Sequence, residues 1–279
     1  MGEAGTIIGS TLVWRPDAAG TSRAFTAVEW CDPGQGGVQV ADSFRVVASR
    51  ARGIAHHRAR FVTSAASGDG GRSQAEAFWA DAIAVLRGLV EADPQHPPLF
   101  PRVERRERGE YRLLVRPSPA VHVGAGLATA VVATAGSDPR HVPQTKGPDL
   151  ERLAGLRTQV QSCGADEAVI VDARGHVIEG AYSSLLVARG GRLGVVAQPA
   201  PRIPSVTERL VRDAARTEGL TVDEVTLAAA ELSGASLWLM SALHGARAVS
   251  AWVDGPTLHR DVERDSWLRE TLESAAVPL

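Results

Sequence analysis

Lys146 is the one lysine in a chain of 279 residues that carries 30 basic side chains, so every other basic side chain is arginine. Arginine keeps its proton at every accessible pH. A desolvated lysine can lose its proton and then act as a nucleophile, a base or a Schiff-base partner. A single lysine therefore points to a task that arginine cannot perform. The alternative is an arginine-rich composition with one ordinary surface lysine.

The surroundings of Lys146 favour a reactive role. It lies in QTKGPDLERL, which the pattern places in a loop between a strand and a helix. Such a loop can direct a side chain into a cleft while its backbone stays fixed. Further along, GADEAVIVDARGHVIEGAYSSLLV predicts a buried hairpin in which Glu179 ends a strand among apolar neighbours. A buried carboxylate requires a partner, such as a protonated heterocyclic nitrogen. A salt-bridged turn residue is the plainer interpretation.

A third feature is the segment IPSVTERL, which predicts a short turn leading into a helix that begins at Val206 and Thr207. The free N–H groups and the dipole of a helix start bind phosphate, although an ordinary capped helix would show the same pattern. A nucleophilic amine, a buried carboxylate and a phosphate-binding helix start are together the parts that pyridoxal 5'-phosphate requires. The lysine joins its aldehyde, the carboxylate keeps its ring nitrogen protonated, and the helix start with an arginine holds its phosphate.

The elements that must position these residues form two unequal α/β halves. The first half predicts strands over 6–14, 24–30, 38–47, 99–103 and 111–116, a helix starting within 56–64, and an amphipathic helix over 78–90 with Ser73 as its N-cap. A Pro/Gly-marked break over 117–126 is the candidate linker. The second half predicts strands over 127–134, 168–172, 176–179, 184–188, 193–197, 222–226, 236–240 and 248–253 and helices over 149–162, 206–217 and 262–274.

Composition excludes several other classes of function. The net charge of −2 gives no sign of nucleic-acid binding, and the basic run RVERRER, cut by two glutamates, predicts a solvated strand-and-turn edge. Cys31 and Cys163 lie far apart without CxxC spacing, so neither a disulfide framework nor a zinc site is indicated. The glycine-rich segment 67–73 lacks the lysine of a phosphate loop. With neither a signal peptide nor a long apolar stretch, the chain is expected to be soluble and cytoplasmic, with no membrane partner.

On these residues the chain resembles the class IV (fold type IV) pyridoxal-phosphate enzymes, which include branched-chain and D-amino-acid aminotransferases and aminodeoxychorismate lyases. The segments ADSFRV and HHRARF are similar to the family's DGxF and HxxRL/F, which places phosphate binding on Arg60. Lys146 precedes Glu167 of GADEAV by 21 residues, as the Schiff-base lysine does in the lyases. GHVIEGAYSSLL resembles GxVxEGxxSNLF, which makes Glu179 the partner of the ring nitrogen.

The resemblance extends to the phosphate and substrate sides of the site. PSVTE stands where the family has PGITR, so the resemblance assigns Val206–Thr207 to the phosphate. SALHGARAV aligns with the segment that closes over the phosphate and the substrate carboxylate, where this chain has Leu243 and His244. FPR falls among the substrate-side residues, so Phe100 and Arg102 are candidates and Arg102 could take a substrate carboxylate. A solvated strand arginine is the alternative for Arg102.

Several positions depart from the family pattern. The common Asn of SNL is Ser184, the arginine after the Thr is Glu208, and the threonine over the phosphate is Leu243. The tyrosine that branched-chain aminotransferases carry soon after the lysine is missing from GPDLERL. The Lys-Gly-Pro-Asp-Leu and Ser-Ala-Leu-His-Gly runs are more similar to the lyase branch.

The resemblance implies a small N-terminal α/β domain (1–118), a larger C-terminal α/β pseudo-barrel domain (119–279) that binds pyridoxal phosphate, and a homodimer whose site a partner loop completes. The leading activity is a lyase that converts 4-amino-4-deoxychorismate into 4-aminobenzoate and pyruvate. An aminotransferase acting on branched-chain or D-amino acids is the alternative, and a non-catalytic member of the fold is a third. No metal is expected.

Overall fold

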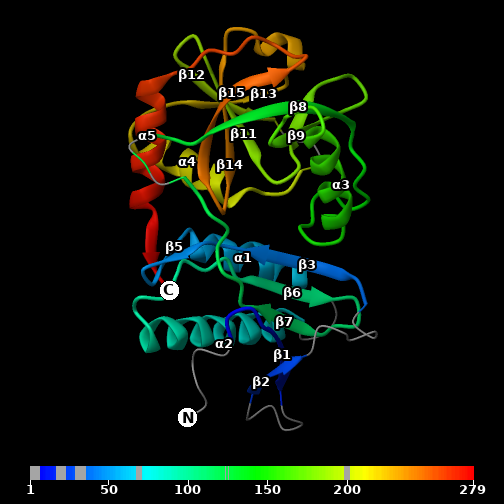
Figure 1. The fold of residues 1–279 in the computed structure, drawn as a ribbon, viewed down its shortest axis with the longest axis vertical. Coiled ribbons are helices and arrows are strands. Elements are labelled where there is room, and N and C mark those ends of the chain that lie inside the picture. The colour runs from blue at the N-terminus through cyan, green and yellow to red at the C-terminus, as the bar shows by residue number, and fades with distance from the viewer. Residues whose placement is uncertain are drawn as a thin grey trace. The chain divides into compact units, whose positions relative to one another are not determined.

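The chain forms two compact units (Figure 1). The computed structural model describes residues 7–16, 23–28, 36–66, 71–122, 124, 126–197 and 202–279. Unit 1 comprises Met1–Ala120 and two later segments, Thr145–Pro148 and Ala276–Leu279. Unit 2 comprises Val121–Gln144 and Asp149–Ala275. Helices and sheets occur in both units, which confirms the predicted α/β class.

Unit 1 is built on a five-stranded antiparallel sheet with the order β2-β1-β7-β6-β3. Its strands are β1 (Thr11–Pro16), β2 (Arg23–Val28), β3 (Val38–Ser43), β6 (Arg102–Arg106) and β7 (Tyr111–Leu114). A three-stranded sheet joins β4 (Val46–Val47), β5 (Arg50–Arg52) and β16 (Ala276–Pro278). The end of the chain thus returns to unit 1. The predicted strand over 38–47 is divided into β3 and β4, because these two halves pair in different sheets.

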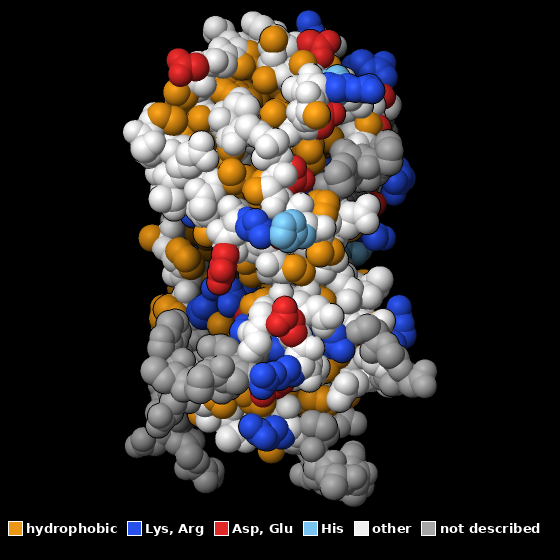
Figure 2. Space-filling model, turned by 90° about the vertical axis from the view of Figure 1, so that its right-hand side faces the viewer, with side chains coloured by type: hydrophobic (Ala, Val, Ile, Leu, Met, Phe, Trp, Pro, Cys, Tyr) orange, Lys and Arg blue, Asp and Glu red, His pale blue; other side chains and the backbone are white. Residues whose placement is uncertain are grey.

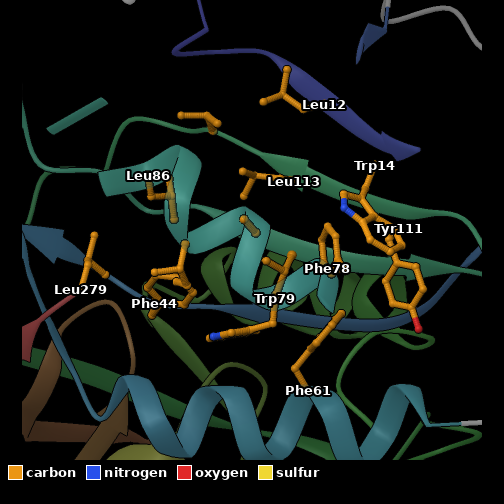
Figure 3. Close-up of a cluster of buried hydrophobic side chains, with 14 of the residues drawn as sticks. Leu12, Trp14, Phe44, Phe61, Phe78, Trp79, Leu86, Tyr111, Leu113 and Leu279 are labelled. Carbon is orange, nitrogen blue, oxygen red and sulfur yellow. The ribbon is translucent and has the colours of Figure 1, made fainter. Parts of the chain in front are cut away.

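The helices of unit 1, α1 (Ile54–Ala65) and α2 (Gly71–Ala92), pack with the sheet around an aromatic core (Figure 3). The ring centroid of Phe78 in α2 lies 4.9 Å from that of Tyr111 in β7 and 5.8 Å from that of Phe61 in α1. Apolar residues spaced three or four apart give both helices one buried face. This core fixes the strands that carry the charged residues described below.

Two predictions for unit 1 are wrong. Helix α2 begins at Gly71 and not after a cap at Ser73, because its buried face continues back one turn from Ala75 to Gly71; residues 67–70 of that segment lie outside the described part. The RVERRER run is no solvated edge, since β6 lies between β7 and β3 and Glu104 is only 1% exposed. A charge buried in this way requires a partner, and Arg102 and Arg106 both pair with Glu104.

Unit 2 is built on an eight-stranded mixed sheet with the order β10-β9-β8-β15-β14-β11-β12-β13, which curls into a half-barrel. Its strands are β8 (Thr129–Ser137), β9 (Glu167–Val171), β10 (Val177–Gly180), β11 (Ser184–Arg189), β12 (Arg192–Val196), β13 (Val222–Val225), β14 (Ser236–Ser241) and β15 (Gly245–Val253). β8 pairs in parallel with β9 and β15, β12 pairs in parallel with β13, and the remaining neighbours are antiparallel.

Among the described residues of unit 2, three α-helices cover this sheet: α3 (Leu150–Gln161), α4 (Val206–Thr217) and α5 (Val262–Ser274). A short 3₁₀ helix lies at Ala229–Leu232. The starts of α4 and α5 agree with the predicted ones because each has a local signal. The Ser205 hydroxyl accepts a hydrogen bond from Glu208 N, and the Asp261 carboxylate accepts one from Arg264 N. These caps fix where the first free N–H groups of each helix lie.

Within the described residues, no helix is both long enough and apolar enough to cross a membrane. Figure 2 shows acidic and basic side chains scattered over the face that it views. Charges of both signs agree with the small net charge of the sequence.

Candidate active site

The loop that carries Lys146 is fixed against strand β3 of unit 1. Ala41 N donates a hydrogen bond of 2.6 Å to the carbonyl oxygen of Lys146. Gly147 has a φ of +144°, and a Cβ at this position would lie 2.9 Å from both Ala41 N and Val40 Cα. Only glycine allows so close an approach of two backbones without displacement. The backbone at Lys146 therefore has a defined position relative to β3.

The amine of Lys146 has an environment that favours its neutral form. Its Nζ makes no hydrogen bond or ion pair with any residue in the described part of the chain. Burial lowers its pKa from 10.5 to about 8; the charge of Asp42 opposes this, and those of Arg60, Arg116 and Arg102 add to it. In mildly alkaline solution Lys146 is thus a neutral, nucleophilic amine in a substantial fraction of the molecules.

Asp42, next to the Ala41 contact, is the centre of a buried ion-pair network. Its carboxylate accepts hydrogen bonds from Arg60 Nε at 2.8 Å and Arg60 Nη2 at 2.7 Å, and it lies 2.8 Å from His57 Nδ1. Burial raises the pKa of Asp42, but the charges of Arg60 and His57 outweigh it and hold the pKa far below its usual range. Arg60, the predicted phosphate ligand, is therefore oriented by a bidentate contact with Asp42.

The two predicted substrate-side residues lie at the start of β6, and a third cation that the sequence did not reveal accompanies them. Arg102 forms an ion pair with Glu104. Arg116 lies with its guanidinium carbon 5.4 Å from the centroid of the Phe100 ring, and its Nε donates to Phe100 O at 3.2 Å. Because β6 and β7 run antiparallel, Arg102 pairs with Leu114, and Arg116 two residues later faces the same side. The alternation of side chains along an extended strand is the sequence pattern from which the position of Arg116 could have been predicted.

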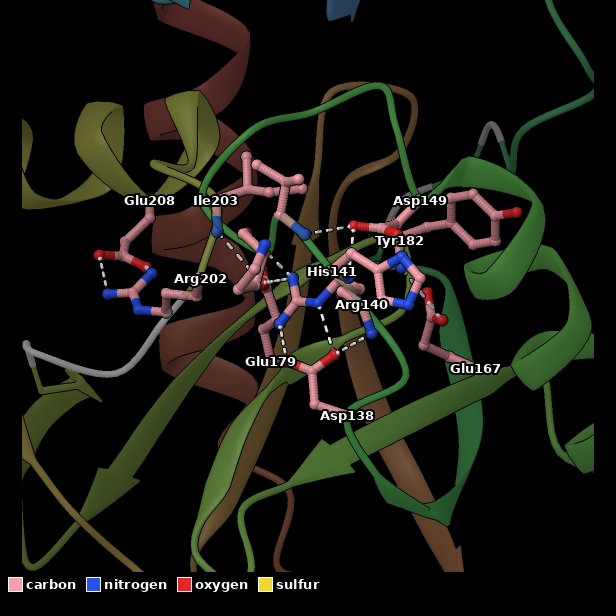
Figure 4. A network of polar contacts seen from close by, with 12 residues as sticks. Asp138, Arg140, His141, Asp149, Glu167, Glu179, Tyr182, Arg202, Ile203 and Glu208 are labelled. Carbon is pink, nitrogen blue, oxygen red and sulfur yellow. Dashed lines mark hydrogen bonds and ion pairs between the residues drawn. The ribbon is translucent and has the colours of Figure 1, made fainter. Parts of the chain in front are cut away.

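In unit 2, Glu179 lies near the end of β10 and is 4% exposed (Figure 4). Its Oε1 accepts a hydrogen bond of 3.1 Å from Ile203 N and a short contact from Arg140 Nη1. Burial raises the pKa of Glu179 to about 7, although the Arg140 charge acts to lower it. Its Oε2 has no hydrogen-bond partner in the described part of the chain. The predicted hairpin and the predicted burial of this carboxylate are confirmed.

Arg140 is a second residue that the sequence did not reveal. Asp138 holds it in a two-pronged contact, with Nε and Nη2 each 2.8 Å from a carboxylate oxygen. The same guanidinium reaches Glu179 through Nη1 (Figure 4). Arg140 therefore carries a fixed positive charge to one oxygen of Glu179 and leaves the other available. The need of a buried carboxylate for a cation was the only sequence signal for it.

A hydrogen bond from strand β11 supports the start of α4. Ser205, its N-cap, accepts hydrogen bonds from Glu208 N at 3.2 Å and from the Ser184 hydroxyl at 2.8 Å. The N–H groups of Val206 and Thr207 have no acceptor among the described residues, as expected for the first turn of a helix. The Ile203 contact links this turn to Glu179. Two free N–H groups and the helix dipole thus form a site suited to an anion.

Two of the departures from the family pattern have structural explanations. Ser184 supports the N-cap of α4 through the hydroxyl contact with Ser205. Glu208 is buried, and Arg202 neutralises it through contacts of 2.6 Å and 3.0 Å (Figure 4). The serine thus supports the helix start, and the glutamate leaves no uncompensated charge there.

Leu243 and His244 lie in the tight turn between β14 and β15. His244 N donates a hydrogen bond of 3.2 Å to the Ser241 hydroxyl, and Gly245 closes the turn with a φ of +77°. Both side chains are half-buried. The structure thus joins Glu179 to the α4 start within unit 2, and Lys146 to Arg60 and Arg102 within unit 1.

Comparison with known families decides which class of protein carries these groups. The family described as amino-transferase class IV matches residues 39–252, which is most of the chain. The chain belongs to this family. As a member, it is a class IV pyridoxal-phosphate-dependent enzyme, either an aminotransferase or a lyase. No curated protein matches the sequence.

Several solved structures, described below by their names, share the fold of this chain. The fold IV transaminase CpuTA1 from Curtobacterium pusillum is 19% identical, with a TM-score of 0.74 over 94% of this chain and 96% of that one. A hypothetical aminotransferase from Mycobacterium tuberculosis in its PLP-bound form is 19% identical, with a TM-score of 0.71 over 95% and 98%. A Legionella pneumophila protein provisionally named a 4-amino-4-deoxychorismate lyase is 15% identical, with a TM-score of 0.68 over 88% and 97%. These similarities confirm the predicted fold type IV architecture.

Proposed function

We propose that this class IV enzyme binds pyridoxal 5'-phosphate through Lys146. The observation that carries the proposal is the amine itself, which a glycine-dependent loop holds in place without any hydrogen-bond partner among the described residues and with a lowered pKa. Two further groups fit the same cofactor. Glu179 has a carboxylate oxygen without a partner, which suits a protonated ring nitrogen, and Val206 and Thr207 offer two N–H groups, which suit a phosphate.

Each residue of the proposed site has a defined task. When bound, pyridoxal phosphate supplies an electron sink for negative charge at the substrate α-carbon. Lys146 would hold the cofactor through its amine and would act as the general base that takes the proton from the amine-bearing carbon of the substrate. A pKa of about 8 suits this task in neutral to mildly alkaline solution. Arg60 assists the start of α4 at the phosphate. Glu179, with Arg140 behind it, holds the ring nitrogen.

The substrate side is assigned to two groups of residues. The turn of Leu243 and His244 closes over the phosphate and a carboxylate of the substrate. We assign Phe100 and Arg102 to the remainder of the substrate. These assignments rest on the motif resemblance and on the position of each residue in a turn or at a strand start, where its backbone is fixed.

We propose elimination as the reaction, so that the enzyme is a lyase of the aminodeoxychorismate type that releases pyruvate. The runs around Lys146 and His244 support this choice. Transamination of branched-chain or D-amino acids is the second candidate, because the Curtobacterium and Mycobacterium structures carry transaminase and aminotransferase names. A binding protein without turnover is the third. We also propose a homodimer, with residues 1–118 as the small domain and 119–279 as the larger cofactor-binding domain.

Absorbance and product assays test the proposal in sequence. Wild-type protein mixed with pyridoxal phosphate should develop the absorption band of a lysine-bound cofactor. Lys146→Arg should lack the band while keeping the positive charge and the fold, so it is the matched control. A wild-type protein that stays colourless would reject the cofactor. Pyruvate release from 4-amino-4-deoxychorismate without amino transfer to 2-oxoglutarate supports the lyase, and amino transfer without pyruvate replaces it by the second candidate.

A further inference from the structure

Glu167 is a buried carboxylate to which the proposed function gives no task. It begins β9 and is 2% exposed. Burial raises its pKa, and the charge of Arg247 opposes this. Arg247 Nη2 lies 3.8 Å from Glu167 Oε2, which is close enough for an ion pair but too long for a hydrogen bond. A buried carboxylate is costly unless its oxygens are hydrogen-bonded, so the groups that donate to these oxygens indicate what Glu167 does.

The oxygens of Glu167 bind the turn that joins β10 to β11. Oε1 accepts a hydrogen bond of 3.3 Å from Tyr182 N (Figure 4). Oε2 accepts one of 3.3 Å from the Ser183 hydroxyl. The next residue of β9 contacts the same turn, since Ala181 N donates to Ala168 O at 2.9 Å. Three successive residues of the turn are thus fixed by the first two residues of β9.

Gly180 leaves room for this arrangement. A Cβ at this position would overlap Ser183 Oγ and would lie 3.2 Å from Glu167 Cγ. Gly180 N also donates a hydrogen bond of 2.7 Å to Ser183 O, which closes the turn. A side chain at position 180 would therefore push the Ser183 hydroxyl away from Glu167.

The turn matters for Glu179 because the strand pairing before it is irregular. Between Val177 and Glu179 the register of β10 against β9 shifts, which marks a β-bulge. A bulge changes the direction of the side chains that follow it, and a slip of one residue would turn them to the other face of the sheet. In the described part of the chain, the pairing beyond the bulge consists of Glu179 and Gly180. The contacts of Glu167 come directly after these two residues and hold β10 in register.

We propose that Glu167 is a positioning residue, which fixes the β10–β11 turn and thereby holds the Glu179 carboxylate against the ring nitrogen of the cofactor. This inference rests on the proposed function, which assigns the ring nitrogen to Glu179. The phosphate side is held separately. Ser184, which supports the α4 start, lies opposite Met240 in the pairing of β11 with β14. Loss of Glu167 therefore affects the ring-nitrogen contact and leaves the phosphate contact in place.

Calorimetric titration of the apoprotein with two cofactors tests the inference. One is pyridoxal 5'-phosphate, and the other is its 1-deaza analogue, in which a carbon replaces the ring nitrogen and Glu179 has no partner. Glu167→Ala should weaken pyridoxal phosphate binding on the order of tenfold, the loss expected when one charge-assisted hydrogen bond is displaced. Binding of the analogue should stay unchanged. Glu167→Gln keeps an acceptor oxygen for the turn and should restore most of the lost affinity.

Asp265→Ala is the matched control. Asp265 is also a buried carboxylate of unit 2, and it accepts hydrogen bonds from Trp238 Nε1 at 2.6 Å and from Arg260 Nε at 2.9 Å. Neither contact involves β9, β10 or the turn after them. This variant should lower the free energy of unfolding without changing the preference for pyridoxal phosphate over the analogue.

Three results would overturn the inference. Equal weakening of both cofactors by Glu167→Ala would show that Glu167 only stabilises unit 2. Unchanged binding of both would show that the turn is held without it. A Glu167→Gln variant as weak as Glu167→Ala would show that the charge matters and the hydrogen bonds do not.

A second variant and the wild-type protein keep the test decisive. If Glu167→Ala fails to fold, Ser183→Ala removes the hydroxyl contact alone and should give a smaller loss for pyridoxal phosphate only; an unchanged affinity there would overturn the inference. A wild-type protein that binds both cofactors equally, or neither, would refute the proposed function itself, and the inference would fall with it.

Discussion

Gly147→Ala tests how the loop holds the reactive amine. The added Cβ would lie 2.9 Å from Ala41 N and Val40 Cα and 3.0 Å from Val40 C, and backbone atoms cannot rotate out of its way. Either the loop or β3 must move, which disrupts the 2.6 Å hydrogen bond between Ala41 N and Lys146 O at a cost of about 1 kcal/mol. A φ of +144° adds about 1–3 kcal/mol for a residue with a side chain. The free energy of unfolding should therefore fall by about 2–4 kcal/mol.

Gly109→Ala is the matched control in the same unit. Gly109 has a φ of +82° but no atom within 4 Å of its would-be Cβ, so this variant bears only the backbone strain. Urea denaturation should show a larger loss of stability for Gly147→Ala. Titration with pyridoxal phosphate should show at least about tenfold weaker binding for that variant alone, because only its Lys146 is displaced. Equal stability losses in the two variants, with equal cofactor affinity, would refute the close-approach reasoning.

Three further predictions concern the amine, the carboxylate and the helix start. Only the neutral Lys146 amine attacks pyridoxal phosphate, so the rate of cofactor capture by the apoprotein should rise with pH around 8 rather than around 10.5. A midpoint of the rate-against-pH curve above 10 would contradict the lowered pKa of Lys146. Burial raises the pKa of Glu179 from 4.5 to about 7, so between these pH values the folded state holds a proton that the unfolded chain has lost. The free energy of unfolding should therefore fall as the pH rises from about 4.5 to about 7. Glu179→Gln should flatten that fall in urea denaturation, and an unchanged slope would argue against the raised pKa. Ser184→Ala removes the 2.8 Å hydrogen bond to Ser205, so it should lower the free energy of unfolding by about 1 kcal/mol and weaken cofactor binding. Unchanged stability in calorimetry and unchanged cofactor affinity in titration would show that this hydrogen bond is dispensable.

Local signals predicted the helices and many strands of unit 2. The helices at Val206–Thr217 and Val262–Ser274 begin and end as predicted because a capping residue and an apolar period mark each one. The three-stranded sheet of unit 1 was missed, because its pairing joins Ala276–Pro278 to residues more than two hundred positions earlier. The wrong interpretation of RVERRER has the same origin. The run is buried because Val38–Ser43 of β3 pairs with β6. The buried Glu104 is then neutralised by Arg102 and Arg106 of its own strand.

The same distinction holds for the candidate site. Lys146 stood out because it is unique in the sequence, and Glu179 because its neighbours are apolar. Arg140 and Arg116 gave no comparable signal, since arginine is common throughout this chain and their importance comes from what they contact. Which arginine reaches Glu179, and which one lies against Phe100, depends on how separate strands come together.

Borohydride reduction of the protein loaded with pyridoxal phosphate, followed by mass spectrometry of its peptides, measures the central proposal most directly. Since Lys146 is the only lysine in the sequence, an N-terminal α-amino group is the competing primary amine. The account predicts one pyridoxyl group, fixed on the peptide that contains Lys146. A modification confined to the N-terminal amine, or none at all after loading and reduction, would contradict it.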